Sequence, residues 1–114
     1  MNKRYYVYII KCSGNRLYTG YTSDPEKRFN QHKTGKGGAK FTSGFKPLSI
    51  AALWEIEGTK GEAMKVEALI KTLKSEIKKK IISEPCLLSE LVFERFPDIS
   101  LTLSTLEVDI TFEN

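Results

Sequence analysis

The sequence predicts an α+β fold in one domain, and two features of its 114 residues carry that prediction. Aromatic and β-branched residues fill two neighbouring segments near the N-terminus, at 5–10 and 17–21, as is typical of β-strands. Apolar residues recur three and four positions apart from 66 to 73, as is typical of an amphipathic helix. Together these features predict a sheet that packs against helices.

The turn between the first two strands determines which tyrosines share a face of the sheet. A three-residue loop at the polar segment 13–15 pairs Tyr8 with Gly20, and it pairs Ile10 with Tyr18. Tyr8 and Tyr18 then lie diagonally on one face. A two-residue loop would place them on opposite faces, so the register decides whether the two phenols can act together. Because glycine weakens a strand, Gly20 is expected to leave room for the close approach of a backbone or a ligand.

Further strand and helix signals follow along the chain. Asp24 and Pro25 are the N-cap and first residue of a short helix that ends near residue 33. Glycines and a proline interrupt residues 33–47, so no regular structure is expected there. Residues 48–57 have the length and apolar density of a buried third strand.

Three helical segments are expected after this strand. Thr59 and Glu62 have the spacing of a capping box and begin the helix that contains residues 66–73. Residues 75–82 are expected to form a second helical piece, which ends before a proline. Residues 87–96 suit a short amphipathic helix.

The C-terminal segment differs from the rest in pattern and in charge. Apolar residues alternate at 99–103 and again, in the opposite phase, at 106–112, which predicts two short strands or one bulged strand. Residues 1–84 carry seventeen Lys and Arg against eight Asp and Glu, a net charge of +9, whereas residues 85–114 carry −5. We therefore divide the chain into a basic body, 1–84, and an acidic extension, 85–114, packed on the body or appended to it. The extension either adds to the core or folds back over the basic face.

Charge and composition restrict the class of protein. A basic body favours a polyanionic partner, nucleic acid or an anionic membrane surface, although charge also serves solubility. Cys12 and Cys86 form no disulfide framework and, with a single histidine, supply too few zinc ligands. The apolar runs are far shorter than the roughly 20 residues that span a membrane, and the first ends at Lys11 without a cleavage site for a signal peptide. We expect a soluble, unprocessed protein of the reducing cytoplasm.

Three side chains are candidates for chemistry. Arg28 and His32 lie four residues apart on the first predicted helix and so project the same way, one as a permanent cation and one as a group that donates or accepts a proton. Glu67 lies about a quarter turn from the centre of its helix's apolar face. A carboxylate there is either a salt-bridge partner or an oxygen ligand for a hard cation such as Mg²⁺.

The glycine-rich segment 33–46 interleaves lysines with two phenylalanines. Such a loop either tracks a phosphate backbone and offers stacking surfaces or is a solvated connection anchored by its aromatic residues. No glycine-lysine pair is followed by Ser or Thr at the spacing of a P-loop, so the segment is not a nucleotide-binding loop of that type.

Taken in order, these motifs resemble the GIY-YIG endonucleases. The matching features are Tyr6-Val7-Tyr8, Tyr18-Thr19-Gly20 ten residues later, Arg28-x-x-x-His32 on a helix, and Glu67 on a later helix. The small stand-alone bacterial members are similar also over residues 18–22 and 35–40. The resemblance covers about residues 4–83.

The resemblance implies a three-stranded antiparallel sheet flanked by helices, to which this chain adds a C-terminal helix and a short β extension. It implies that a single divalent cation, Mg²⁺ or Mn²⁺, assists the hydrolysis of a phosphodiester bond. Relatives act on branched, flapped or damaged DNA, so a role in repair or recombination is the corresponding expectation.

The resemblance also implies a role for each matching residue. Tyr18, or Tyr8 as in some members, would deprotonate or orient the attacking water, although a phenol with a pKa of about 10 is a poor base unless nearby cations favour its phenolate. Arg28 would hold the phosphate, His32 would assist proton transfer and Glu67 would bind the metal. The expected nucleic-acid contacts are Gly20, Tyr21, Lys33, Lys36, Lys40, Phe41 and Lys46.

The sequence departs from the family pattern in three places. The first triplet begins with tyrosine rather than glycine, the asparagine that many members carry after the metal-binding helix is replaced by a lysine-rich stretch, and residues 85–114 match nothing in the family. Two alternatives therefore stay open. The chain is a nucleic-acid-binding module without turnover, or an interaction protein whose strands after Asp98 extend a partner's sheet. The oligomeric state is left open.

Overall fold

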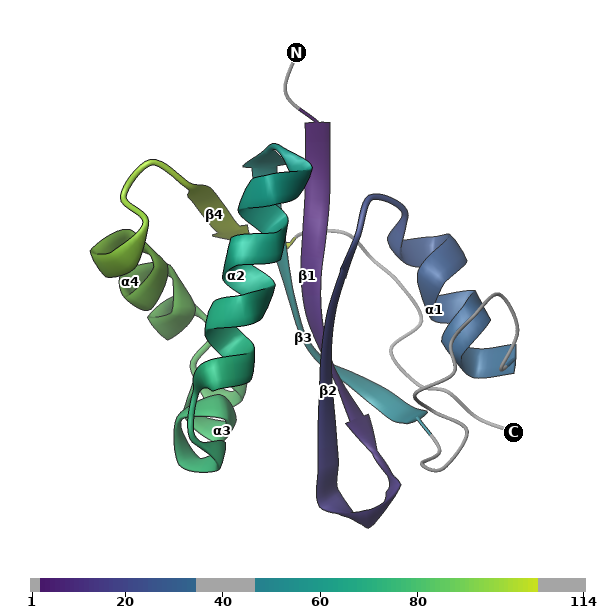
Figure 1. Ribbon diagram of the computed structural model, residues 1–114. Helices are drawn as coiled ribbons and strands as arrows, with labels where there is room; N and C mark the ends of the chain where they lie inside the picture. Colours follow the sequence, from purple (N-terminus) through teal and green to yellow (C-terminus); the bar gives the residue numbers. More distant parts are fainter. Residues whose placement is uncertain (1–2, 35–46, 105–114) are drawn as a thin grey trace.

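A four-stranded antiparallel sheet forms the centre of the molecule, and helices pack on both of its faces (Figure 1). The structure is a computed structural model that describes residues 3–34 and 47–104, without the side chains of 32–34. The strands, in the order β2-β1-β3-β4, are β1 (Lys3–Cys12), β2 (Arg16–Thr22), β3 (Pro47–Gly58) and β4 (Ser100–Leu103). The α+β class is confirmed. The sheet has one strand more than the resemblance implied, because β4 pairs with the outer edge of β3.

The hairpin of β1 and β2 has the predicted register. The connection Ser13–Asn15 is a single 3-10 turn in which Gly14 and Asn15 have positive φ angles of 73° and 59°. These are left-handed conformations that glycine and asparagine adopt most readily. Tyr8 faces Gly20 across the ladder and Ile10 faces Tyr18. The two tyrosines therefore lie on one face, as a three-residue loop requires.

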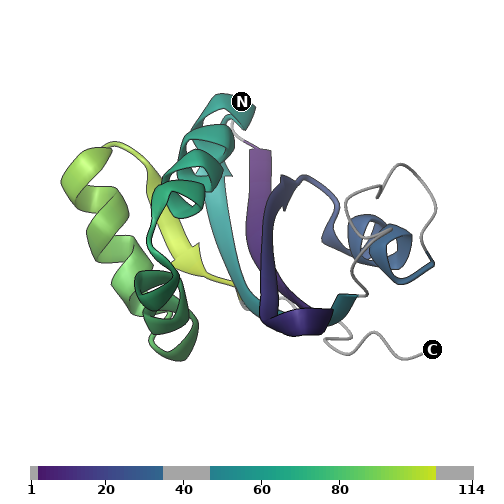
Figure 2. The same ribbon diagram turned by 60° about the horizontal axis from the view of Figure 1, so that its bottom comes forward.

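The helices form two layers. On one face lie α2 (Lys60–Thr72), α3 (Ser75–Ser83) and α4 (Cys86–Arg95), and on the other lies α1 (Pro25–Thr34), an arrangement that Figure 2 shows from a second direction. The capping box of α2 is present: the Thr59 side chain accepts a hydrogen bond from the Glu62 backbone, and the Glu62 carboxylate accepts one from the Thr59 backbone.

The central strand β1 is buried on both faces, which explains its continuous apolar run. Val7 and Ile9 join the larger core under α2, α3 and α4, which also contains Trp54. Tyr8 and Ile10 join a smaller core under α1. Residues on the two faces of β1 therefore pack into two separate hydrophobic clusters.

The described part of the acidic extension, residues 85–104, belongs to the same core and the same sheet. Leu88 and Val92 of α4 are buried in the larger cluster. The Trp54 indole Nε1 donates a hydrogen bond of 3.0 Å to the Pro85 carbonyl. Residues 100–103 extend this chain's own sheet through β3, and the second alternating segment, 106–112, lies outside the described residues.

The two cysteines are free thiols: Cys12 is buried and Cys86 is exposed. Within the residues that the structure describes, every helix is too short or too polar to cross a lipid bilayer.

Candidate functional site

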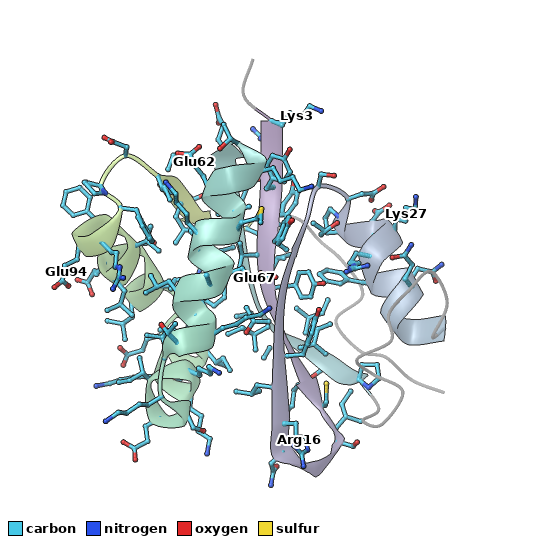
Figure 3. All side chains as sticks on the ribbon, in the orientation of Figure 1. Lys3, Arg16, Lys27, Glu62, Glu67 and Glu94 are labelled. Atoms are coloured by element: carbon cyan, nitrogen blue, oxygen red, sulfur yellow. The ribbon has the colours of Figure 1, made fainter. Side chains whose placement is uncertain are left out.

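A cleft of about 390 Å³ lies where α1 and α2 approach the edge strand β2 from its two faces. Tyr18 packs against the core under α1, whereas Tyr21 packs against the core under α2, and both line the cleft. The cleft therefore crosses the outer edge of β2. In Figure 3, Glu67 lies on the side of α2 that is next to β2. The lining residues are Tyr5, Tyr18, Gly20, Tyr21, Thr22, Ser23, Arg28, Lys60 and Glu67.

Gly20 makes room for the Tyr8 phenol. A Cβ atom on Gly20 would lie 2.5 Å from the Tyr8 hydroxyl oxygen and 2.7 Å from Cζ, closer than van der Waals contact allows. A backbone or a ligand was expected to approach Gly20 closely. The group that does so in the structure is the Tyr8 side chain. The Tyr8 ring is fully buried, so this tyrosine lies beneath the cleft rather than along its wall.

Helix α1 places Arg28 against that phenol. The helix begins where the Asp24 Oδ1 atom accepts a hydrogen bond of 3.2 Å from the Lys27 backbone, which confirms the predicted cap. The buried Phe29 ring meets Tyr8 edge-on, with ring centroids 5.1 Å apart, and holds the helix to the sheet. Arg28 Nε then donates a hydrogen bond of 3.3 Å to the Tyr8 hydroxyl. Arg28 Nη1 donates a second bond of 3.3 Å to Gln31 Oε1, so the guanidinium is oriented on two sides.

Tyr8 and Tyr18 lie close together, and burial raises the pKa of both phenols. Their ring centroids are 6.4 Å apart. Burial raises the pKa of Tyr8 to about 12, although the bond from Arg28 opposes the shift. Burial also raises the pKa of Tyr18, against the nearby charge of Arg28 and together with that of Glu67. Both phenols are consequently neutral at neutral pH in the protein without bound ligand.

Glu67 is held at the cleft by the amphipathic face of α2. Its neighbour Val66 is fully buried in the core, which leaves Glu67 at the border of the apolar face with 19% of its side chain exposed. The Lys71 Nζ atom lies 3.6 Å from the carboxylate, one helical turn away. Glu67 also acts electrostatically on Tyr8, Tyr18 and Arg28, so the four charged or titratable groups form one cluster.

The donor set of the cleft fits one hard divalent cation. Among the side chains that the structure describes, no group of three or more His, Cys, Asp or Glu could hold a metal ion. Mg²⁺ needs only one or two protein carboxylates, since water and substrate phosphate complete its shell. The partly buried Glu67 carboxylate, which lines the cleft, is an oxygen donor of the kind that would hold such a cation.

The structure brings together most of the predicted site residues. Tyr18, Gly20, Tyr21, Arg28 and Glu67 line the cleft, and Tyr8 lies beneath it. The backbone of His32 and Lys33 continues α1, but their side chains lie outside the described part of the chain, as do residues Lys36, Lys40, Phe41 and Lys46.

Sequence reasoning missed four residues of the cleft, Tyr5, Thr22, Ser23 and Lys60. Tyr5 and Lys60 had a usable signal. Tyr5 is two residues before Val7, which pairs with Tyr21, so Tyr5 and Tyr21 share a face of the sheet. Lys60 is seven residues before Glu67 and therefore shares its face of the helix.

The described part of the acidic extension does not cover this cleft. All its lining residues lie between positions 5 and 67, and β4 is at the opposite end of the sheet from β2. Residues 85–104 therefore extend the core, as one of the two alternatives expects, and leave the cleft uncovered.

Comparison with known proteins assigns the chain to a family. Residues 4–81 match the family model of the GIY-YIG catalytic domain. A UPF0213 protein of Staphylococcus saprophyticus is 44% identical over 81 residues, 71% of this chain and 96% of that protein. A UPF0213 protein of Bacillus velezensis is 38% identical over 94 residues, 82% of this chain and 93% of that protein.

Among solved structures, the solution NMR structure of the UPF0213 protein BH0048 from Bacillus halodurans is 40% identical, with a TM-score of 0.46, and the match covers 70% of this chain and 83% of that one. The matched segment, 4–81, contains every residue that lines the cleft. The chain belongs to the GIY-YIG family of nuclease domains.

Proposed function

We propose that this protein is a divalent-metal-dependent endonuclease that hydrolyses phosphodiester bonds in DNA. The observation that supports the proposal most is the convergence of Tyr18, Arg28 and Glu67 on one cleft, with Tyr8 beneath them. These are a phenol, a cationic fork and an oxygen ligand, the groups that in-line attack on a phosphodiester requires.

Arg28 holds the phosphate that is cleaved. A guanidinium matches two phosphate oxygens and stabilises the charge that grows on them in the transition state. The Tyr8 hydroxyl accepts the bond from Nε and Gln31 Oε1 accepts one from Nη1, so the remaining N–H groups of the two terminal nitrogens are left for the substrate. Tyr8 is therefore a positioning residue, since its buried ring does not line the cleft.

Tyr18 orients the attacking water and removes its proton. It is the tyrosine of the pair that lines the cleft. Its phenolate is the active form, and its raised pKa makes that form scarce at neutral pH. His32, one turn after Arg28 on α1, assists the proton transfer.

Glu67 binds Mg²⁺ or Mn²⁺, with water and the substrate completing the shell. Such a cation would supply positive charge for the leaving oxygen. In the absence of the cation, Lys71 neutralises the carboxylate.

We place this activity on branched, flapped or damaged DNA in the cytoplasm, in repair or recombination. Gly20, Tyr21 and the segment 33–46 contact the nucleic acid. The extension after residue 85 remains a candidate surface for a protein partner, because β4 is an edge strand of the described sheet.

One observation favours a second function, nucleic-acid binding without turnover. Burial raises the pKa of both Tyr8 and Tyr18, so neither is a ready base at pH 7. A binding module would keep the basic cleft and show steep salt dependence without forming products.

Cleavage assays on labelled single-stranded, duplex, flapped and junction substrates with Mg²⁺ or Mn²⁺ distinguish the two functions. The nuclease cleaves at least one of them, and Arg28→Ala and Glu67→Ala abolish the products. If no substrate is cut while salt-dependent binding persists, the binding module is the correct function.

A further inference from the structure

Lys60, the first residue of α2, lines the same cleft as Arg28 and Glu67. The roles proposed for Tyr18, Arg28 and Glu67 do not involve the Lys60 side chain. Lys60 and Glu67 are seven residues apart and so share a face of the helix, with about 10.5 Å between them along its axis. The cleft therefore extends two helical turns beyond the carboxylate and ends at a cation.

The charge of Lys60 is not neutralised within the described residues. The ion pairs there join Arg4 to Glu55 and Lys71 to Glu67, and neither involves Lys60. Two lysines lie on this side of α2. Lys71 forms an ion pair with the Glu67 carboxylate, whereas Lys60 forms none with a described residue and lines the cleft.

A lysine is also unfavourable at this position for the helix itself. The N-terminus of a helix carries partial positive charge, which disfavours cations in the first turn. The capping box of Thr59 and Glu62 already serves the helix end, so Lys60 does not contribute to it. A residue that departs from a local rule without compensation in the fold commonly serves function.

We propose that the substrate backbone runs along α2 and that Lys60 binds a phosphate beyond the one held by Arg28. This inference rests on the proposed function, because it needs a nucleic-acid strand in the cleft. The cleft volume of about 390 Å³ exceeds what a phosphate alone requires and lies within the range of sites that hold small organic ligands. Tyr5 and Tyr21 line the same cleft, and their rings offer stacking surfaces to the nucleoside between the two phosphates.

Lys65 supplies a matched control on the same helix. It lies about 200° around the helix axis from Glu67, and its Nζ atom is 5.8 Å from the centroid of the Phe96 ring, at the contact with the C-terminal helix. Lys65→Gln therefore removes the same charge from α2 on the face away from the cleft.

The test measures binding to a labelled duplex and to a labelled single strand in EDTA, where no cleavage occurs, over a range of salt concentrations. With Lys60→Gln, the slope of log affinity against log salt becomes shallower by about 0.9 on the duplex or about 0.7 on the single strand, one phosphate contact in each case. Lys65→Gln keeps the wild-type slope, and Lys60→Arg restores it. In cleavage assays with Mg²⁺, Lys60→Gln loses kcat/KM mainly through KM, as expected for a residue that binds substrate and transition state equally.

Equal slopes for Lys60→Gln and Lys65→Gln would overturn the inference while leaving the nuclease intact. Absence of salt-dependent binding by the wild type would overturn the inference and the proposed function together. A thermal unfolding midpoint of Lys60→Gln at or above that of the wild type shows that its weaker binding does not come from misfolding.

Discussion

Gly20 is the residue on which the geometry of the cleft depends most closely. Gly20→Ala places a Cβ atom 2.5 Å from the Tyr8 hydroxyl, and the buried ring has little space into which to move. We expect a loss of about 1–3 kcal/mol in the free energy of unfolding, as for other overpacked cores. The displaced phenol also releases Arg28, so cleavage should fall by more than the loss of folded protein explains.

Gly61→Ala is the matched control in denaturant titrations. A Cβ atom there meets only Thr59 Oγ1, at an ordinary contact of 3.8 Å, and alanine suits a helix better than glycine. If both alanine variants unfold alike, the close contact at Gly20 is not what the structure indicates.

The buried Tyr8 phenol makes stability fall in alkali. Its pKa is about 12 in the folded chain, against about 10 in the unfolded chain, so the folded state favours the neutral phenol. That contribution, on the order of 2 kcal/mol, is fully present below pH 10 and is lost as pH rises toward 12. Denaturant titrations at pH 8, 10 and 11.5 should show a smaller alkaline loss for Tyr8→Phe than for the wild type.

We expect Tyr18 to give the proposed cleavage reaction its pH dependence. Its pKa is raised above the ordinary value of 10, so the phenolate fraction grows about tenfold per pH unit between pH 7 and 9. Single-turnover rates should rise with that slope, and Tyr18→Phe should be slow at every pH. A flat profile for the wild type would mean that Tyr18 orients the water without removing its proton.

At the scale of elements, local signals predicted the hairpin and the helices. The loop of residues 13–15 specifies the register because its length leaves one way to pair β1 with β2. The capping box at Thr59 specifies the start of α2. The pairing of β4 with β3 was not predictable, since alternation shows that a segment has two faces but not which strand lies beside it.

The contact of α4 with the core is similarly non-local, and it carries a testable consequence. Leu88 is fully buried and packs in the same hydrophobic cluster as Trp54, whereas Phe93 on the same helix is 69% exposed. Leu88→Ala should cost about 2–5 kcal/mol in the free energy of unfolding, while Phe93→Ala should change it by less than about 0.5 kcal/mol. Equal small effects would mean that the extension after residue 85 is not part of the core.

At the scale of the whole molecule, the sequence predicted which residues lie together better than it predicted how far the core and the sheet extend. The resemblance that the motif order carries implied one site for Tyr18, Arg28 and Glu67, and all three line the cleft. Tyr5, Thr22, Ser23 and Lys60 were missed because alternation and helical spacing show which residues share a face, but not which faces meet at the cleft. The charge boundary at residue 85 marks a change of composition, but the core and the sheet continue across it to residue 103.

The central claim is that Glu67 and the cleft around it make this chain a metal-dependent nuclease. The most direct test is the single-turnover cleavage rate of Glu67→Gln with Mg²⁺, beside Lys65→Gln as a control for charge on the same helix. Glutamine keeps the size of the side chain but removes the charge that a cation requires. We predict a loss of roughly 100-fold or more for Glu67→Gln, no loss for Lys65→Gln, and no cleavage by the wild type in EDTA. Cleavage by Glu67→Gln at the wild-type rate would contradict the account.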